Sequence, residues 1–306
     1  MREFKVGISA SLDASRTVHT RAFLNSVALF NQVYDSPLHL VWADDGANAE
    51  MGSRAATTLK RNGVDVVVGH FASDAARAAL QVYSGTDIAV LLPAATLPEL
   101  TQFGQAHRVC CTDNDLIAKM AHGLGETGCG SVFIHKDESV HGRYVADRLG
   151  RALPNAVIDI ASADALVFCG RYEAAKQFLL ARHQEMDSRE VWLTDDALCD
   201  ALLVLAERLS IRIKVVSYRP GSGEVGERLL SQYRQQYASF PGPYFSSTIA
   251  SLEICVALSR GEDTKRSLLK QNFSTSFGDV RFVERESGFG EYIVFDLAND
   301  SLLDVV

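Results

Sequence analysis

The chain has 306 residues, of which 47% are hydrophobic and 22% charged, with a formal net charge of −8 and a pI near 5.5. This length exceeds what one hydrophobic core usually supports, so we expect two lobes of roughly 120 to 150 residues each. The net negative charge, together with the lack of a contiguous stretch of Lys and Arg residues, argues against nucleic acid as a partner. No segment has the ~20 apolar residues of a membrane helix, so direct membrane insertion is not expected either.

The N-terminal sequence and the cysteines indicate the cellular compartment in which the protein is expected. No apolar stretch typical of a secretory signal precedes the first expected strand at Phe4. We therefore expect a cytoplasmic protein, or a periplasmic one whose leader has been removed. The cysteines lack the CxxC and Cys/His spacings of metal sites, so we interpret them as small buried residues in a reducing compartment and expect no metal and no cofactor. They are Cys110, Cys111, Cys129, Cys169, Cys199 and Cys255.

Apolar runs of strand character alternate with segments of helical period through the first part of the chain. Such alternation indicates a parallel sheet covered by helices on both faces. The expected strands are 4–8, 38–43, 64–68, 88–92 and 108–111, and the expected helices are 20–34, 48–62, 74–83 and 98–103.

The same alternation restarts after residue 130, which predicts a second sheet. Pro241-Gly242-Pro243 is interpreted as a linker. The fold class expected is therefore α/β, with two doubly wound parallel-sheet lobes. The expected strands are 132–135, 157–160, 166–169, 191–193 and 212–216, followed by helices 244–260 and 264–271 and by strands 280–283 and 292–296.

Two loops of the first lobe are candidates for ligand binding, because ligands of doubly wound sheets bind at the carboxyl ends of strands where strand order reverses. After the third strand, Ser73 is expected at a helix N-cap; after the fourth, Thr96 and Glu99 spell a capping box. Capping alone would account for these residues. Alternatively, two helix N-termini facing one crevice would suit a carboxylate, each contributing about 0.3–1 kcal/mol when exposed.

Acidic pairs follow strands in both halves. Asp196, with Asp195, follows strand 191–193 and has two interpretations, a helix cap or a partner for a ligand ammonium. The second would contribute about 1.5–3 kcal/mol. Asp44 and Asp45 are interpreted as solvated loop carboxylates.

Catalytic patterns are not found. The sequence contains no GxGxxG or Walker lysine after the first strand, Gly7-Ile8-Ser9-Ala10-Ser11 lacks the final glycine of a GxSxG elbow, and the histidines show no HExxH spacing. We therefore predict no catalytic residue.

These segments together resemble the leucine/isoleucine/valine-binding proteins of branched-chain amino-acid ABC importers and their amide- and urea-binding relatives. The resemblance is strongest over 64–101, in Val-Val-Val-Gly-His-Phe-Ala-Ser and Leu-Pro-Ala-Ala-Thr-Leu-Pro-Glu-Leu-Thr. It implies a type I periplasmic-binding-protein fold whose lobes are joined by a multi-stranded hinge. The first lobe would comprise 1–114 plus 242–285, and the second 115–241 plus 286–306.

The resemblance also implies ligand-binding positions. Carboxylate and ammonium contacts fall on Ser73, Ala94 and Thr96, with Phe71, Ala72 and Ala95 beside them, and the acidic ammonium partner falls on Asp196. Positions that are aromatic in the family fall on His19 and His141, and a tyrosine of the family falls on Arg171 or Tyr172. Because Arg171 and the two histidines are polar, we expect a polar or anionic amino acid rather than a branched aliphatic one.

Two further differences from the family concern a disulfide bond and the size of the second lobe. The cysteines that form a disulfide in secreted members align with Ala47 and Ala72, which agrees with a cytoplasmic site. Only five residues separate Ile160 from Leu166, where the family has a longer loop and a helix, so the second lobe is trimmed by about one helix.

The predicted function is that of a binding protein that closes its two lobes on a small molecule, an amino acid or amide, as a transport receptor or a cytoplasmic sensor. A permease or a regulator is the possible protein partner. The alternative is an enzyme or accessory protein of a biosynthetic pathway with an adapted cleft. A sugar-repressor type of transcription factor is disfavoured, because only three residues precede Phe4 and a helix-turn-helix would have to stand there.

Overall fold

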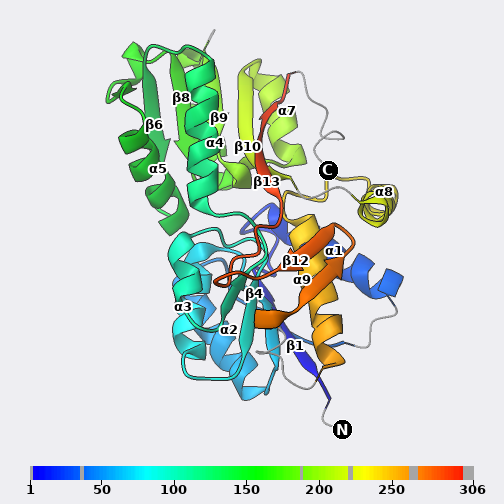
Figure 1. The fold of residues 1–306 in the computed structure, drawn as a ribbon. Helices are drawn as coiled ribbons and strands as arrows, with labels where there is room; N and C mark the ends of the chain where they lie inside the picture. Colours follow the sequence, from blue (N-terminus) through cyan, green and yellow to red (C-terminus); the bar gives the residue numbers. More distant parts are fainter. Residues whose placement is uncertain (1–2, 35–37, 187–188, 220–222, 262–267, 299–306) are drawn as a thin grey trace. The chain divides into compact units, whose positions relative to one another are not determined.

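The computed structural model describes residues 3–34, 38–186, 189–219, 223–261 and 268–298. The chain divides into two compact units (Figure 1). The first comprises Met1–Cys111 and Pro220–Gly290, and the second Thr112–Arg219 and Glu291–Val306. The chain therefore passes three times from one unit to the other.

The sheet of the first unit has the strand order β2-β1-β3-β4-β5, and all its pairs are parallel. β1 lies between β2 and β3, so strand order reverses between β1 and β3. The apolar run of β3 is fully buried, as expected for a parallel strand covered on both faces. The strands are β1 (Lys5–Ala10), β2 (His39–Asp44), β3 (Val66–Gly69), β4 (Ala89–Leu92) and β5 (Ala106–Arg108).

Helices cover both faces of this sheet: α2 and α3 lie on one side, α1 and α9 on the other (Figure 1). α2 and α3 approach closely at Gly52, where a Cβ would come within 2.6 Å of the Ala75 carbonyl oxygen. The helices are α1 (His19–Tyr34), α2 (Ala49–Arg61), α3 (Ser73–Tyr83), the 3-10 helix η1 (Pro98–Gln102), α8 (Glu224–Tyr237) and α9 (Phe245–Ser259), and a hairpin of β11 (Asn272–Thr275) and β12 (Gly278–Arg281) completes the unit.

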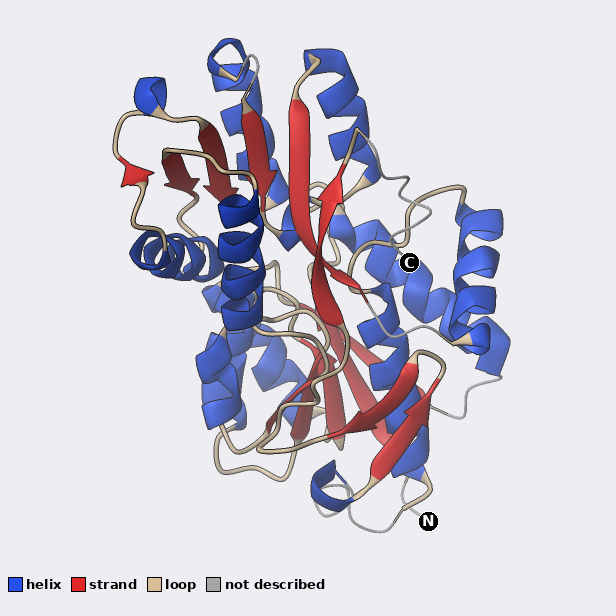
Figure 2. Ribbon diagram, turned by 45° about the horizontal axis from the view of Figure 1, so that its top comes forward, coloured by secondary structure: helices blue, strands red, loops and turns tan. Residues whose placement is uncertain are grey.

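The sheet of the second unit has the order β13-β10-β9-β8-β6-β7 and is parallel except for β13. Strand order reverses between β6 and β8, so both units have the same doubly wound core (Figure 2). The fold class predicted from the sequence is confirmed. The strands are β6 (Val132–Lys136), β7 (Ala156–Val157), β8 (Ala165–Cys169), β9 (Glu190–Leu193), β10 (Arg212–Arg219) and β13 (Glu291–Asp296).

The two helices α4 and α5 of the second unit begin at N-cap residues whose side chains accept a backbone hydrogen bond. At the start of α4, Thr112 and Asp115 form a capping box, and at α5 the Ser139 hydroxyl accepts a hydrogen bond from Gly142 N. A three-residue 3-10 helix is all the helical structure between β7 and β8, in line with the shortened connection in the sequence. The helices are α4 (Asp113–Glu126), α5 (Val140–Ala152), η2 (Ile160–Ser162), α6 (Tyr172–Arg182), η3 (His183–Glu185), η4 (Asp195–Ala197) and α7 (Asp200–Leu209).

Four expected elements differ from those observed, and one of them is the strand expected at 280–283, which lies at Gly278–Arg281. The strand expected at 108–111 lies at Ala106–Arg108, and the one expected at 157–160 stops at Val157, where the chain turns toward η2. Of the helix expected at 264–271, residues 264–267 lie outside the described residues. Residues 268–270 are helical, and the strand β11, which was not expected, follows at once.

The boundary of the first unit also differs from the expected lobe. Residues 220–241 were assigned to the second lobe, but α8 contacts α1 and the start of α9. Asn25 Nδ2 donates to the Tyr233 hydroxyl over 3.3 Å, and the Tyr233 ring lies edge-on to Phe245. Pro241-Gly242-Pro243 therefore lies inside the first unit.

None of the six cysteines, all of which lie in the described residues, forms a disulfide bond: Cys110, Cys111, Cys169 and Cys255 are buried, while Cys129 and Cys199 are half-buried. In the described part of the chain, none of the helices combines the length and the apolar character that crossing a membrane would require.

Candidate functional site

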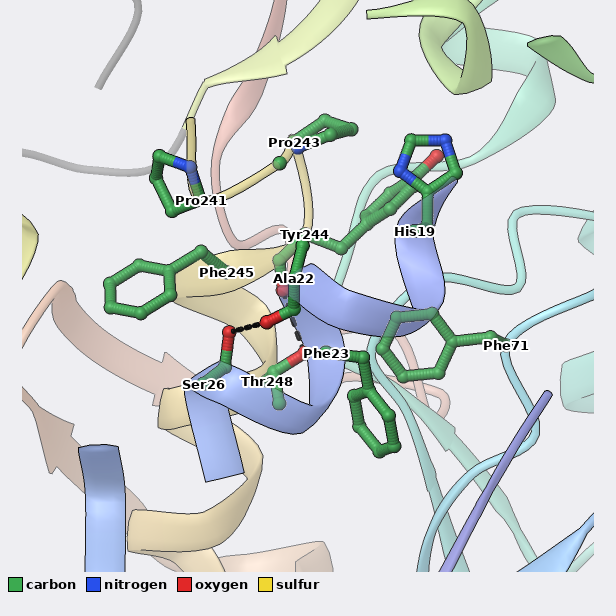
Figure 3. A pocket seen from close by; sticks show the side chains of 11 residues that line it. His19, Ala22, Phe23, Ser26, Phe71, Pro241, Pro243, Tyr244, Phe245 and Thr248 are labelled. Atoms are coloured by element: carbon green, nitrogen blue, oxygen red, sulfur yellow. Dashed lines mark hydrogen bonds between the residues drawn. The ribbon is translucent and has the colours of Figure 1, made fainter. Parts of the chain in front are cut away.

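A small, shallow hollow opens in the first unit between the start of α1 and the Pro-Gly-Pro segment that leads into α9 (Figure 3). It is lined by His19, Ala22, Phe23, Ser26, Phe71, Pro241, Gly242, Pro243, Tyr244, Phe245 and Thr248. Two predicted site residues, His19 and Phe71, thus share one pocket.

The lining of the hollow is largely apolar. The Phe71 ring lies 4.5 Å from that of Phe23 and 6.5 Å from that of Tyr244, centroid to centroid. Two of the three hydroxyls in the wall are engaged with their own helices: Ser26 donates to Ala22 O over 2.6 Å and Thr248 to Tyr244 O over 2.7 Å (Figure 3). The third hydroxyl belongs to Tyr244. The hollow therefore suits an apolar group more than the polar or anionic side chain that the sequence suggested.

The loop after β3 leads from this hollow to the N-terminus of α3. Ser73 was expected to be the N-cap, but it is the first residue of the helix, and Ala72 occupies the N-cap position. Alanine has no side-chain acceptor, so no side chain caps α3. The first backbone N–H groups of this 11-residue helix have no side-chain acceptor, so the N-terminus of α3 favours a bound anion. The hydroxyl of Ser73, a residue that is 6% exposed, is a further hydrogen-bond donor at this position.

The loop after β4 carries Ala94, Ala95 and Thr96, all buried. The expected capping box is absent: the N-cap of η1 is Leu97, so Thr96 lies outside the turn that it would have to cap. The loop is held by side chains from elsewhere in the unit. Ser247 of α9 donates to Pro93 O over 2.6 Å, and the Arg108 guanidinium donates to carbonyl groups farther along the loop.

A fully buried polar network lies behind the loop after β3. His70 Nδ1 is 3.0 Å from Asp45 Oδ2 and 3.0 Å from Ser9 Oγ, and its Nε2 is 3.3 Å from the Tyr83 hydroxyl. The interpretation of Asp45 as a solvated carboxylate is therefore wrong: it is an internal acceptor that ties the end of β2 to His70.

This network does not have the arrangement of a hydrolytic triad. In such a triad the serine and the carboxylate contact opposite ring nitrogens, whereas Ser9 and Asp45 contact the same one. Burial, together with the charge of Asp45, raises the pKa of Tyr83 and keeps its phenol protonated. The network holds the loop that bears Phe71, Ala72 and Ser73.

In the second unit, two carboxylates bind the N-terminus of α6. Asp196 Oδ2 accepts a hydrogen bond from Tyr172 N over 2.9 Å, and Asp137 Oδ2 accepts one from Arg171 N over 2.8 Å. Capping, one of the two interpretations of Asp196, is thus observed, although on a neighbouring helix rather than on η4, the turn in which Asp196 lies. Arg171 occupies the N-cap position of α6.

His141 lies among acidic groups in the same unit. Its Nδ1 is 2.9 Å from Asp113 Oδ1, its Nε2 is 3.6 Å from Asp195 Oδ1, and the Tyr292 hydroxyl donates to the other oxygen of Asp195. Burial by itself would lower the pKa of His141, but the charge and hydrogen bond of Asp113, with the charges of Asp195 and Asp196, raise it to about 10. At neutral pH His141 is therefore an imidazolium.

Sequence reasoning missed several of these residues. Tyr244 and Thr248 line the hollow, but the proline-glycine pattern before them was interpreted only as a linker. Asp45 and His70 follow strands β2 and β3, so their position at the carboxyl edge of the sheet was an available signal. Among the described residues, no group of three or more His, Cys, Asp or Glu side chains could hold a metal ion.

The family of the chain follows from comparison with known proteins. A model of the periplasmic binding protein family matches residues 8–187, which is more than half of the chain. The chain belongs to this family, as the resemblance noted in the sequence implied. No curated protein sequence gives a significant match.

Solved structures of transport receptors share the fold over nearly the whole chain. An ABC transporter substrate-binding protein from Desulfitobacterium hafniense, in complex with Leu, is 17% identical, with 96% of this chain and 97% of that chain covered and a TM-score of 0.76. A leucine binding protein from Thermotoga maritima is 17% identical, with 95% and 94% covered and a TM-score of 0.79. A solute binding protein from R. palustris, in complex with benzoate, is 12% identical, with 97% and 93% covered and a TM-score of 0.79.

Proposed function

We propose that this protein is a receptor for a small amino-acid-like carboxylate with an apolar side chain. The observation that carries the proposal is the continuity of the loop after β3. Phe71 forms a wall of the apolar hollow, and two residues later Ser73 opens the uncapped N-terminus of α3. The carboxylate would bind at Ser73 with Ala94 and Thr96, and the side chain would pack against the mouth of the hollow beside Phe71 and His19.

The ligands named for similar structures support this class. They are leucine, isoleucine, benzoate and 4-hydroxybenzoate, which share a carboxylate and an apolar body. The second unit favours the amino acids among them. Asp113, Asp195 and Asp196 surround one imidazolium, so the carboxyl edge of that sheet keeps an excess of negative charge, which suits an ammonium group.

Leucine and two truncated analogues test the proposal. We expect leucine to bind with a Kd in the micromolar range, which corresponds to about −8 kcal/mol. We expect 4-methylpentanoate, which lacks the ammonium, to bind more weakly, and 3-methylbutylamine, which lacks the carboxylate, not to bind at all. Isothermal titration calorimetry measures all three, with benzoate as a fourth ligand.

The outcomes separate the parts of the proposal. Failure of every carboxylate to bind the folded protein would reject a carboxylate receptor. Tighter binding of benzoate than of leucine would keep the receptor and replace the amino acid by an aromatic acid.

A conservative variant tests the proposed role of Asp196. Asp196→Asn keeps an oxygen that can accept from Tyr172 N but removes the charge. We expect it to weaken leucine binding by tenfold to a hundredfold, since a charged hydrogen bond contributes about 1.5–3 kcal/mol, and to leave 4-methylpentanoate unaffected. Asp137→Asn is the matched control, because Asp137 also binds the start of α6. Equal loss of both ligands in Asp196→Asn would show that Asp196 acts on α6 alone.

The biological setting of the receptor remains a prediction. Six cysteines without a disulfide bond favour the reducing compartment of a cytoplasmic sensor, whereas the family name favours a periplasmic receptor. A permease would be the partner of a transport receptor and a regulator the partner of a sensor. Affinity capture with the leucine-loaded and the ligand-free protein would distinguish them by the partner retained.

A further inference from the structure

Arg108 is a fully buried arginine at the end of β5 whose guanidinium bridges two segments of the first unit. On one side it donates to Ala95 O and, over 2.7 Å, to Leu97 O, both in the loop after β4. On the other side its Nε donates to Glu286 Oε2 over 2.9 Å. One rigid planar group thus holds the proposed ligand loop and the segment around Glu286.

The segment around Glu286 is docked on β5 by its backbone as well. Arg108 N donates to Arg285 O over 2.9 Å, and Ser287 N donates to Arg108 O over 3.2 Å. The second carboxylate oxygen of Glu286 accepts from the Thr101 hydroxyl over 2.7 Å. Both oxygens of this carboxylate are therefore engaged, and its position depends on Arg108 and on the turn after the ligand loop.

Both chain segments at Arg108 lead to places where the chain leaves the first unit. β5 continues to Cys111, the last residue before the first crossing, and the Glu286 segment continues to Gly290, the last residue before the third crossing. The distance along the chain from Arg108 or Glu286 to the crossing is only three or four residues. A movement of the Arg108 guanidinium would therefore displace the backbone at both places where the chain leaves the first unit, after Cys111 and after Gly290.

We propose that Arg108 is a positioning residue that couples ligand occupancy of the Ala94–Thr96 loop to the segment 283–290. The proposal rests on the proposed function. Its physical basis is that the loop carbonyl groups and the Glu286 carboxylate bind a single guanidinium fork, whose donors cannot move independently of one another. When a ligand fixes the loop, the fork and Glu286 are fixed with it, and segment 283–290 opens less often. Lysine could not replace this link, because its ammonium is a point charge on a flexible stem.

Hydrogen exchange followed by mass spectrometry tests the coupling. In the wild-type protein, saturating leucine should slow exchange in peptides covering 71–76, where the loop after β3 enters α3 and the ligand carboxylate is proposed to bind, and also in peptides covering 283–290. In Glu286→Gln and in Arg108→Lys, leucine should still slow exchange at 71–76, but the slowing at 283–290 should fall to less than a third of its wild-type extent. A coupling free energy of 1–3 kcal/mol corresponds to a loss of leucine affinity of about 5-fold to 150-fold in the uncoupled variants.

Arg285→Lys is the matched control, because Arg285 adjoins Glu286 but its Nε donates to Gly104 O and not to the ligand loop. It should retain the wild-type response at both peptides. A purely structural role for Arg108 would lower the melting temperature of both variants yet leave full slowing at 283–290 in saturating ligand, and this result would overturn the proposal. If Arg108→Lys fails to fold, Glu286→Gln alone decides the question.

The test also separates this proposal from the one on which it rests. Slowing at 71–76 without slowing at 283–290 in the wild-type protein would overturn the coupling and leave the receptor function intact. If leucine does not bind but another carboxylate of the panel does, that ligand replaces leucine in the same measurement. Failure of the whole panel would overturn both proposals.

Discussion

Replacing Gly69 by alanine should prevent stable folding of the first unit. Gly69 ends β3 with a φ of +129°, and a Cβ built there would lie 2.0 Å from the backbone carbonyl oxygen of Ser9. Ser9 belongs to the neighbouring strand β1, so the clash can be relieved only by separating two central strands of the sheet. We expect a loss of more than about 4 kcal/mol, beyond the usual range for single substitutions and a large part of the ~5–15 kcal/mol that stabilises a domain.

Gly63→Ala is the matched control for this substitution. Gly63 also has a positive φ, +67°, but a Cβ there meets no atom within 4 Å. Only the backbone strain of a left-handed residue should remain, about 1–2 kcal/mol. Urea unfolding monitored by circular dichroism compares the two variants. Similar stabilities would show that the strands β1 and β3 can separate at low cost.

The stability of the second unit should fall as the pH rises toward 10. The folded-state pKa of His141 is raised from 6.5 to about 10, so the charged imidazole stabilises the fold. This contribution is fully present below about pH 6.5 and is lost as the pH rises through about 10. A shift of this size corresponds to at most about 5 kcal/mol, since each pKa unit is worth about 1.4 kcal/mol.

Urea unfolding between pH 6 and 10.5 measures this dependence. With Trp42 of the first unit replaced by phenylalanine, the remaining Trp192, which is buried in the second unit, reports on that unit alone. His141→Gln should be less stable at neutral pH, because Asp113 and Asp195 lose their counter-charge, and its stability should decline much less over this range. His122→Gln should retain the wild-type slope, because the His122–Glu126 pair is exposed. A wild-type slope in His141→Gln would show that another group carries the pH dependence.

The order of the strands and helices could be predicted from the sequence because each parallel strand is buried on both faces. Runs such as Val66–Val68 are therefore continuous in apolar residues and easily recognised. The strand ends were less predictable. Val109, Cys110 and Cys111 are as buried and apolar as a strand, yet the chain leaves the ladder at Arg108, and side-chain character does not reveal where backbone pairing stops.

The site was partly predictable for a related reason. Ser73 and Thr96 follow strands whose carboxyl ends meet at one edge of the sheet, so their positions followed from topology. Their capping roles did not, because a one-residue displacement of a helix start changes which residue is the cap, and local sequence tolerates either start. The contacts of Arg108 with Glu286 and of His141 with Asp195 join residues far apart in the chain, and a single sequence contains no signal for such pairs.

The uneven burial of the six cysteines has a practical consequence for thiol chemistry. A thiolate is the species that reacts with maleimides and similar reagents, and burial raises the pKa of Cys199 to about 12 and that of Cys169 and Cys255 as well. Cys110 and Cys111 are buried, whereas Cys129 is half-buried in the turn between α4 and β6. The natural chain thus offers Cys129 as a single attachment point for a dye, and a fluorescent reporter could be made without removing the other five thiols.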